Sequence, residues 1–316
     1  MDRPVKNAIF LSGGGAMGSF HIGFFKALEN QEIKKDTIFG CSAGAIVGAA
    51  ATYMNSDEML KIWESLSFEN VLNIDSSKIK NYNGNHLILD KVLNLDSKTI
   101  KNYENVRRNV HLLGQCGKSC FKKFPHLMID FENFSNLISS NINGECVLSS
   151  PVNFGISTTA LPSGKMVNVW KKDMVGDPLD YVKASAHLPV LRRKRLIDNK
   201  HYLDWCRFRR YPFEVFDDID FDNLIIVNTE AKKIKKRFID PIDEYFDESF
   251  VKIYNYDGKI TVSAVPKENE DYLENSKKII FINNDNRSSI VDFDKDHVEK
   301  NYKAGLKASE DVLKVV

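Results

Sequence analysis

Two short apolar runs near the N-terminus, each closed by a glycine-rich turn, constrain the fold of this chain more than any other feature. The run at 8–11 leads into a first turn at 13–18, and the run at 37–40 leads into a second turn at 40–44. Apolar residues at helical spacing begin at each turn. Short apolar runs that alternate with helices predict an α/β fold with a parallel sheet.

The second turn reads GCSAG over residues 40–44, which is a GxSxG pattern centred on Ser42. Small residues on both sides of a serine permit the sharp strand-to-helix turn that holds its hydroxyl ready to attack an ester carbonyl. The first turn, GGGAMG over residues 13–18, supplies backbone N–H groups for the developing oxyanion. Together the two turns predict a serine acyl hydrolase whose nucleophile comes early in the chain.

Each turn also has another interpretation. Ser42 precedes an alanine-rich helix, and serine is a good N-cap residue there. The first turn contains the GxGxxG spacing of a dinucleotide-binding site at Gly13, Gly15 and Gly18. Such a site needs an acidic residue after the second strand, where this chain has Ser42, so acyl transfer is preferred.

The composition narrows the classes of function. The chain has 44 Lys and Arg against 43 Asp and Glu, so no overall field attracts it to nucleic acid. Its five cysteines are sparse and odd in number, which favours a reducing compartment. No signal-peptide core and no run of about 20 apolar residues is seen, so a cytoplasmic location is expected. The sequence predicts no metal site and no organic cofactor.

No internal repeat or low-complexity linker divides the chain, so a single domain over 1–316 is expected. Its motif-bearing core is predicted at about 7–210, with C-terminal strands and a closing helix at 211–316. Two hairpins are predicted, one with its turn at Gly164 and one with its turn at 198–200. The aromatic segment 121–142 is expected to form a cap or lid.

Ser42 needs a base, and the sequence offers a histidine or a carboxylate. The α/β-hydrolase order requires a late histidine, but His297 lies in a charged, helix-like run typical of a solvated surface. The carboxylate alternative is Asp204, which follows the second strand of the 198–200 hairpin. Asp198 is a rival carboxylate within the turn itself, and Asp204 is preferred to it.

On these residues the chain resembles the patatin-like phospholipases. Their pattern combines a GGGxxG loop, a GxSxG turn, an ASxxxP-like stretch, matched here by residues 184–189, and an aspartate after a short hairpin. The resemblance runs from about Asn7 to Asp204 and implies a three-layer α/β/α fold with a mostly parallel central sheet. The site residues that it implies are a catalytic dyad of Ser42 and Asp204, oxyanion donors at Gly13, Gly14 and Gly15, and nucleophile-turn glycines at Gly40 and Gly44.

Two residues depart from the family pattern. Met17 stands where the family usually has Arg or Lys in its glycine loop, so any anion contact by that side chain is lost while the backbone donors remain. Trp205 stands where the family usually has Gly after the aspartate. A bulky residue at that position predicts a reoriented Asp204 or a reshaped acyl pocket.

The resemblance implies hydrolysis of fatty-acyl esters of phospholipids or lysophospholipids through an acyl-enzyme. A carboxylate with a pKa of about 4 is a weak base, so proton transfer must accompany stabilisation of the oxyanion. Two rival functions are a carboxylesterase or thioesterase with the same machinery, and a catalytically impaired lipid-binding homologue. Hydrolysis of monomeric esters, hydrolysis of phospholipid vesicles and binding to vesicles distinguish these three functions.

Three basic runs bear on the expected partners. Two of them, 192–195 and 207–210, bracket Asp204, and the third covers 232–237. Such runs can attract phosphate headgroups and peripheral contact with an anionic membrane. The alternative is solvated charge balanced by the acidic run 217–220. A lipid acyl ester is the expected substrate, and no nucleic acid is expected as a partner.

Overall fold

The computed structural model describes the chain in segments. The described residues are 5–67, 71, 131–161, 163–187, 195–204, 212–229, 250–256, 259–263, 276–285 and 293–316. Trp205, the basic runs at 207–210 and 232–237, and the larger part of the run at 192–195 lie outside them. The expected single domain therefore stays a prediction.

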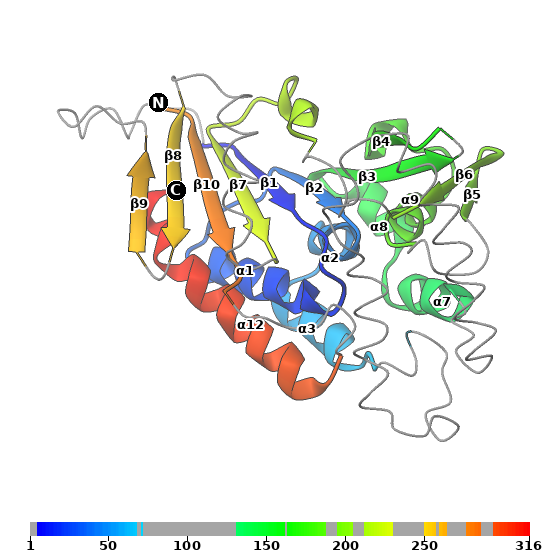
Figure 1. Ribbon diagram of the computed structural model, residues 1–316, viewed down its shortest axis with the longest axis horizontal. Helices are drawn as coiled ribbons and strands as arrows, with labels where there is room; N and C mark the ends of the chain where they lie inside the picture. Colours follow the sequence, from blue (N-terminus) through cyan, green and yellow to red (C-terminus); the bar gives the residue numbers. More distant parts are fainter. Residues whose placement is uncertain are drawn as a thin grey trace.

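One sheet contains all ten strands found in the described segments (Figure 1). The strands are β1 Asn7–Leu11, β2 Thr37–Cys41, β3 Asn153–Leu161, β4 Lys165–Trp170, β5 Arg195–Ile197, β6 Lys200–Leu203, β7 Asn223–Asn228, β8 Val251–Tyr256, β9 Lys259–Ser263 and β10 Lys278–Asn283. Each strand in the series β5-β6-β3-β2-β1-β7-β10-β8-β9 is hydrogen-bonded to the next, and β4 pairs with β3. The strands from β3 to β8 in this order are parallel, and the pairings at both margins are antiparallel.

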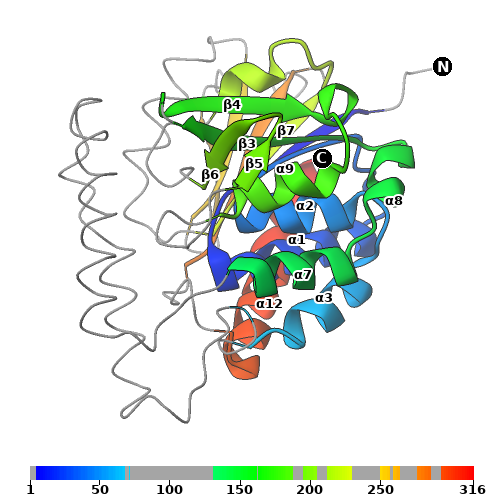
Figure 2. The ribbon, with the colours of Figure 1, turned by 90° about the vertical axis from the view of Figure 1, so that its right-hand side faces the viewer.

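The described α-helices pack on one face of this sheet (Figure 2). They are α1 Gly18–Asn30, α2 Ala43–Ala51, α3 Ser56–Glu64, α7 Phe131–Asn141, α8 Gly144–Ser149, α9 Pro178–Ser185 and α12 Lys295–Glu310. Apolar side chains from these helices join one face of β1, β2, β7 and β10 in a single buried cluster. Within the described segments, none of the helices has the length and apolar composition needed to cross a bilayer.

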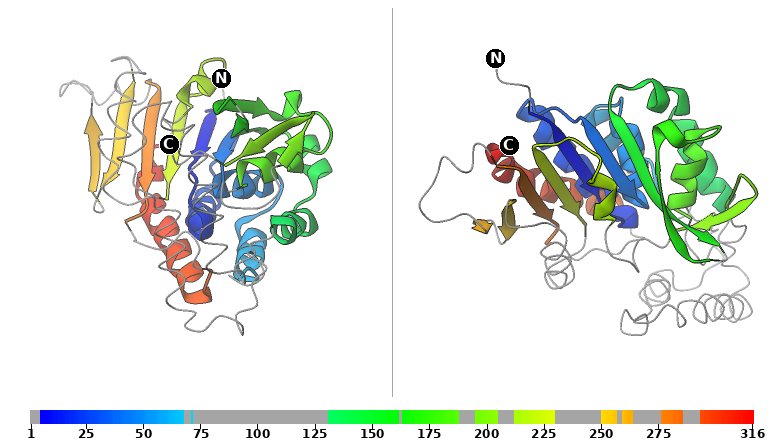
Figure 3. Two further views of the ribbon diagram at one scale, coloured as in Figure 1. Left: turned by 45° about the vertical axis from the view of Figure 1, so that its right-hand side comes forward. Right: turned by 90° about the horizontal axis from the view of Figure 1, so that it is seen from above.

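The opposite face of the sheet is covered by a second apolar cluster. Its outer part is the 3-10 helix η5, Phe213–Phe216, which packs on aromatic residues of β1 and β2. The rings of Phe10 and Phe213 lie 6.3 Å apart, and those of Phe39 and Phe216 lie 6.1 Å apart. The two further views show the sheet strands side by side with α12 crossing beneath them (Figure 3). The predicted α/β class and mostly parallel central sheet are confirmed.

Both predicted hairpins are present. Strands β3 and β4 are antiparallel and are joined through Gly164, whose φ is 65°. Strands β5 and β6 are antiparallel and are joined through Asp198 and Asn199, with φ values of 50° and 59°. Two successive left-handed residues are typical of a tight hairpin turn, and Asp and Asn tolerate that conformation.

Part of the expected cap belongs to the helical layer. Helix α7 occupies 131–141, and its Ile138 is only 4% exposed within the main apolar cluster. The described part of this segment, 131–142, is thus a helix and its end with one face packed on the core, and the remainder lies outside the described residues. The hairpin of β8 and β9 was not predicted from the sequence.

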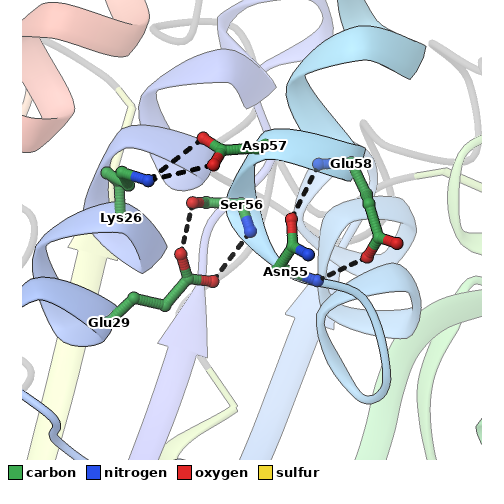
Figure 4. A network of polar contacts seen from close by, with 6 residues as sticks. All are labelled: Lys26, Glu29, Asn55, Ser56, Asp57 and Glu58. Atoms are coloured by element: carbon green, nitrogen blue, oxygen red, sulfur yellow. Dashed lines mark hydrogen bonds and ion pairs between the residues drawn. The ribbon is translucent and has the colours of Figure 1, made fainter.

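A polar network holds α3 against α1 (Figure 4). Asn55 and Glu58 form a capping box at the start of α3, with both hydrogen bonds at 2.9 Å. Glu29 of α1 accepts hydrogen bonds from the amide and the hydroxyl of Ser56. The indole N–H of Trp63, near the other end of α3, donates to the carbonyl of Ala16 at 3.0 Å. Helix α3 is thereby anchored at the first glycine turn.

Candidate active site

Ser42 lies between β2 and α2 in a strained backbone conformation. Its φ is 54° and its ψ is −125°, a left-handed φ that a residue with a Cβ adopts at an energetic cost. It occupies the N-cap position of α2, yet its side chain forms no capping hydrogen bond. The conformation is the one expected of a nucleophile turn, and it disfavours the alternative of a simple helix cap.

The two glycines of the second turn permit close contact between main chains. A Cβ built on Gly40 would overlap the carbonyl of Gly44, and one built on Gly44 would overlap the carbonyl of Leu11. Only glycine fits where two backbones approach this closely. The turn is therefore fixed by packing of backbone against backbone.

The amide of Ser42 has a partner from a distant helix. It donates a hydrogen bond of 2.9 Å to the hydroxyl of Ser185, the last residue of α9. The Ser185 hydroxyl in turn donates to the carbonyl of Ser157 in β3 at 2.6 Å. The ASxxxP-like stretch thus positions the main chain of Ser42, a role that the sequence alone did not assign to Ser185.

Strands β2 and β6 lie on the same edge of β3. Strand β4 pairs with residues 155–160 of β3, and β2 pairs with residues 153–157. Because these two partners overlap, they occupy opposite edges. Strand β6 pairs with residues 159–161, where it overlaps β4, so it takes the edge that β2 occupies.

This shared edge brings Ser42 and Asp204 to one level of the sheet. Strand β2 ends opposite Ser157, and β6 ends opposite Thr159. Ser42, the residue after β2, and Asp204, the residue after β6, therefore both reach the level of Thr158, and they approach it from opposite directions. The C-terminal ends of two strands that are far apart in sequence meet head to head at this point.

Asp204 is held in a buried position. Its residue is 6% exposed, and its amide donates to the carbonyl of His187 at 2.7 Å. His187 lies two residues beyond the end of α9, so this helix end and the residues after it contact both predicted members of the dyad. The carbonyl of Leu203 also accepts a 3.2 Å hydrogen bond from the hydroxyl of Thr158. His187 is itself 1% exposed, and it supports Asp204 through its backbone carbonyl.

The glycine loop lies beside Ser42. Gly13, Gly14 and Gly15 are partly exposed, as is Ser42, whereas the residues on either side of each turn are buried. A Cβ built on Gly13 would lie 3.1 Å from the Cβ of Ser42. The two glycine turns are therefore adjacent, and their solvent-accessible atoms lie together at the C-terminal ends of parallel strands, where α/β folds place ligands.

The environment of the loop contains two further informative side chains. Met17 is 5% exposed, so the residue that departs from the family pattern packs into the interior. His21, one turn into α1, has its pKa lowered to about 3 because burial disfavours the imidazolium, and the nearby Val227 backbone opposes this shift only in part. His21 is neutral at physiological pH. Amide dipoles at the start of α2 add positive potential near Ser42.

Sequence reasoning missed Ser12 and Thr229, which contact the glycine loop from β1 and β7. Their position at the C-terminal ends of parallel strands was the signal that could have identified them. His297, the rival base, lies in the first turn of α12. Among the described residues, no three His, Cys, Asp or Glu side chains are grouped as a metal ion requires.

A strained serine turn after a parallel strand, with a glycine loop beside it, is the arrangement that α/β hydrolases use to present a nucleophile. The family model for patatin-like phospholipases matches residues 9–216. The chain therefore belongs to the patatin-like phospholipase family, as the sequence predicted.

Similar proteins include lipases and phospholipases. Triacylglycerol lipase ptl3 of Schizosaccharomyces pombe is 47% identical over 51 residues, which make up 16% of this chain and 11% of that protein. Patatin-like phospholipase domain-containing protein 6 of Homo sapiens is 23% identical over 261 residues, or 68% of this chain and 19% of that protein. The chain thus spans less than a fifth of these curated relatives.

A solved structure supports the fold. The crystal structure of VipD from Legionella pneumophila matches with a TM-score of 0.51 and 14% sequence identity, covering 98% of this chain and 67% of that one. At this identity the match shows a shared fold, and functional roles have to be argued from the site itself.

Proposed function

We propose that this protein hydrolyses fatty-acyl esters of phospholipids or lysophospholipids, with Ser42 as nucleophile and Asp204 as its base. The observation that carries the proposal is the meeting of β2 and β6 on one edge of β3, which brings both residues to the level of Thr158. The left-handed backbone of Ser42 and the burial of Asp204 support it. The local sequence patterns around Ser42 and Asp204 do not by themselves require β2 and β6 to meet on one strand.

The proposed reaction has two half-reactions. The Ser42 oxygen attacks the ester carbonyl while its proton passes to Asp204, and the carbonyl oxygen becomes an oxyanion. The tetrahedral intermediate then expels the alcohol, which takes the proton from Asp204, and leaves an acyl-Ser42. Asp204 next deprotonates a water molecule that attacks the acyl carbon. Collapse releases the fatty acid, and the proton returns to Ser42.

Backbone N–H groups of Gly13, Gly14 and Gly15 are the proposed oxyanion donors. The amide of Ser42 already donates to Ser185, so the proposal assigns these hydrogen bonds to the glycine loop and not to that amide. Each such donor contributes about 3 kcal/mol to transition-state stabilisation in comparable hydrolases. A weak carboxylate base depends on this stabilisation, since proton transfer is coupled to charge development.

The substrate class is drawn from the family, whose members include phospholipases and lipases. The proposal includes peripheral contact with a membrane surface and a cytoplasmic location, in keeping with the composition. Triacylglycerol is a second acyl-ester substrate to test, because one relative is named as a triacylglycerol lipase.

The decisive measurement is fatty-acid release from phospholipid vesicles, triacylglycerol emulsion and a monomeric short-chain ester. Ser42→Ala and Asp204→Asn should each lower the rate by about 1,000-fold or more, as loss of a nucleophile or its base does in other hydrolases. Asp198→Asn is the matched carboxylate control, because Asp198 is exposed in the hairpin turn and Asn tolerates its positive φ. Ser65→Ala, at an exposed site, is the matched serine control.

The outcome also tests the rivals. Activity on the monomeric ester without gain on vesicles would favour a carboxylesterase or thioesterase. Vesicle binding without hydrolysis, identical for wild type and Ser42→Ala, would favour the impaired homologue. If His297→Ala abolishes hydrolysis and Asp204→Asn does not, the dyad is wrong.

A further inference from the structure

Thr229 lies at the end of β7, against the glycine loop. Its residue is fully buried, and its hydroxyl donates a hydrogen bond to the carbonyl of Gly13. Its amide donates to the hydroxyl of Ser12 at 3.0 Å, and the Ser12 hydroxyl lies 3.2 Å from the same Gly13 carbonyl. Two buried hydroxyls therefore converge on one carbonyl of the loop.

That carbonyl determines where the next amide points. Gly13 C=O and Gly14 N–H belong to one planar trans peptide, in which the two groups point in opposite directions. Strand β1 lies between β7 on one side and β2 on the other. A Gly13 carbonyl that points to Thr229 at β7 therefore turns the Gly14 N–H toward β2, whose end carries Ser42.

Packing holds the peptide in this orientation. A Cβ built on Gly14 would overlap the side chain of Thr229, so the loop already rests against this residue. The amide of Ser12 donates to the carbonyl of Val227 at 3.0 Å, which joins the start of the loop to the end of β7. Rotation of the Gly13–Gly14 peptide would remove the Gly13 acceptor of the buried Thr229 hydroxyl and leave it only the longer contact of 3.3 Å with the Ser12 hydroxyl, which disfavours the rotation.

We propose that Thr229 is a positioning residue for the oxyanion hole, and that its hydroxyl aims the Gly14 N–H at the reacting carbonyl. This inference rests on the proposed acyl hydrolysis at Ser42. Thr229 lies beyond the 9–216 segment that the family model matches. Its role follows from the contacts of β7.

The test compares Thr229→Val, which keeps the shape and removes the hydroxyl, with Thr229→Ser, which keeps the hydroxyl. Thr229→Val should lower kcat about 10- to 100-fold with KM little changed, somewhat less than outright loss of an oxyanion donor. Thr229→Ser should restore kcat to within about threefold of wild type. Thr52→Val is the matched control, because Thr52 is also buried and its hydroxyl bonds only within the last turn of α2, at 2.7 Å.

A second readout separates aiming from general structural damage. A trifluoromethyl ketone forms a tetrahedral oxyanion on the serine, so its affinity should fall in parallel with kcat/KM in Thr229→Val. If Thr229→Val does not fold, Thr229→Cys, whose thiol is a weak donor, should show the same losses at smaller amplitude.

Two outcomes would overturn the inference. In the first, wild type is active and Ser42→Ala is inactive, but folded Thr229→Val or Thr229→Cys keeps wild-type kcat and ketone affinity. In that case Thr229 has no positioning role and the hydrolase proposal stands. In the second outcome, neither wild type nor Ser42→Ala hydrolyses any of the esters. The hydrolase proposal and the positioning role of Thr229 then fail together.

Discussion

The two glycine turns of this protein lie side by side but are fixed by different kinds of contact. In the second turn, Gly40 and Gly44 approach main-chain carbonyls, one of them within the turn itself. In the first turn, Gly14 and Gly18 approach the side chains of Thr229 and Trp63, which come from distant elements. The glycines of the nucleophile turn thus pack against main chain, whereas those of the oxyanion loop pack against side chains from distant elements.

The largest effect should come from Gly44→Ala. Its Cβ would overlap backbone atoms of Leu11 and Ser12, which no side-chain rotation can relieve. We expect a loss of about 3 kcal/mol in the free energy of unfolding, the upper end for overpacking, together with loss of esterase activity. Chemical denaturation and ester hydrolysis measure both. A stable, active Gly44→Ala would contradict the account of this turn.

Gly14→Ala should cost less and should be correctable. The added methyl meets the Thr229 side chain, and the φ of Gly14, 170°, suits any residue. We expect a loss of about 2 kcal/mol in stability, of which a second change, Thr229→Ala, should recover about half. A double-mutant cycle on denaturation midpoints tests this coupling. Additive effects would mean that the loop is not shaped by Thr229.

His21 should give the first-turn region a pH dependence of stability. Its pKa is about 3 in the folded protein and 6.5 in the unfolded chain, so between these values the unfolded state binds more protons. Stability contributed by neutral His21 is present above pH 6.5 and is lost as pH falls, by up to about 1.4 kcal/mol per unit. Urea unfolding of wild type and His21→Gln between pH 5 and 7 should show a shallower slope in the variant.

Gly48→Ala should have the smallest effect. Its Cβ would meet only side chains of Ile38, Phe154 and Leu11, at 3.0 to 3.5 Å. Alanine gains about 1 kcal/mol over glycine within a helix, which offsets the small displacement required. We expect a net change within about 1 kcal/mol and unchanged activity, measured as for Gly44→Ala. If Gly48→Ala lost as much stability as Gly44→Ala, contacts with side chains would be as restrictive as contacts with backbone, and the proposed difference between them would be wrong.

The same distinction explains what could be predicted from the sequence. The strand–turn–helix units around Ser42 and both hairpins depend on neighbouring residues, and their patterns are local. Thr229 and Ser185 act across separations of 216 and 143 residues, and no local pattern reveals the partners that they contact. The shared edge of β3 depends on three pairings at once, so the approach of Asp204 to Ser42 came only through family resemblance. The catalytic roles themselves remain a proposal.

The attachment of the β5–β6 hairpin has a consequence for how activity is lost. Three register pairs, at residues 159–161, join this hairpin to the rest of the sheet, whereas Ser42 follows a strand bordered on both sides by parallel neighbours. Segments with few pairings open locally at a lower free energy than the core. Under mild denaturation the proposed hydrolase should lose its base while its parallel core remains folded, and inactivation should precede unfolding.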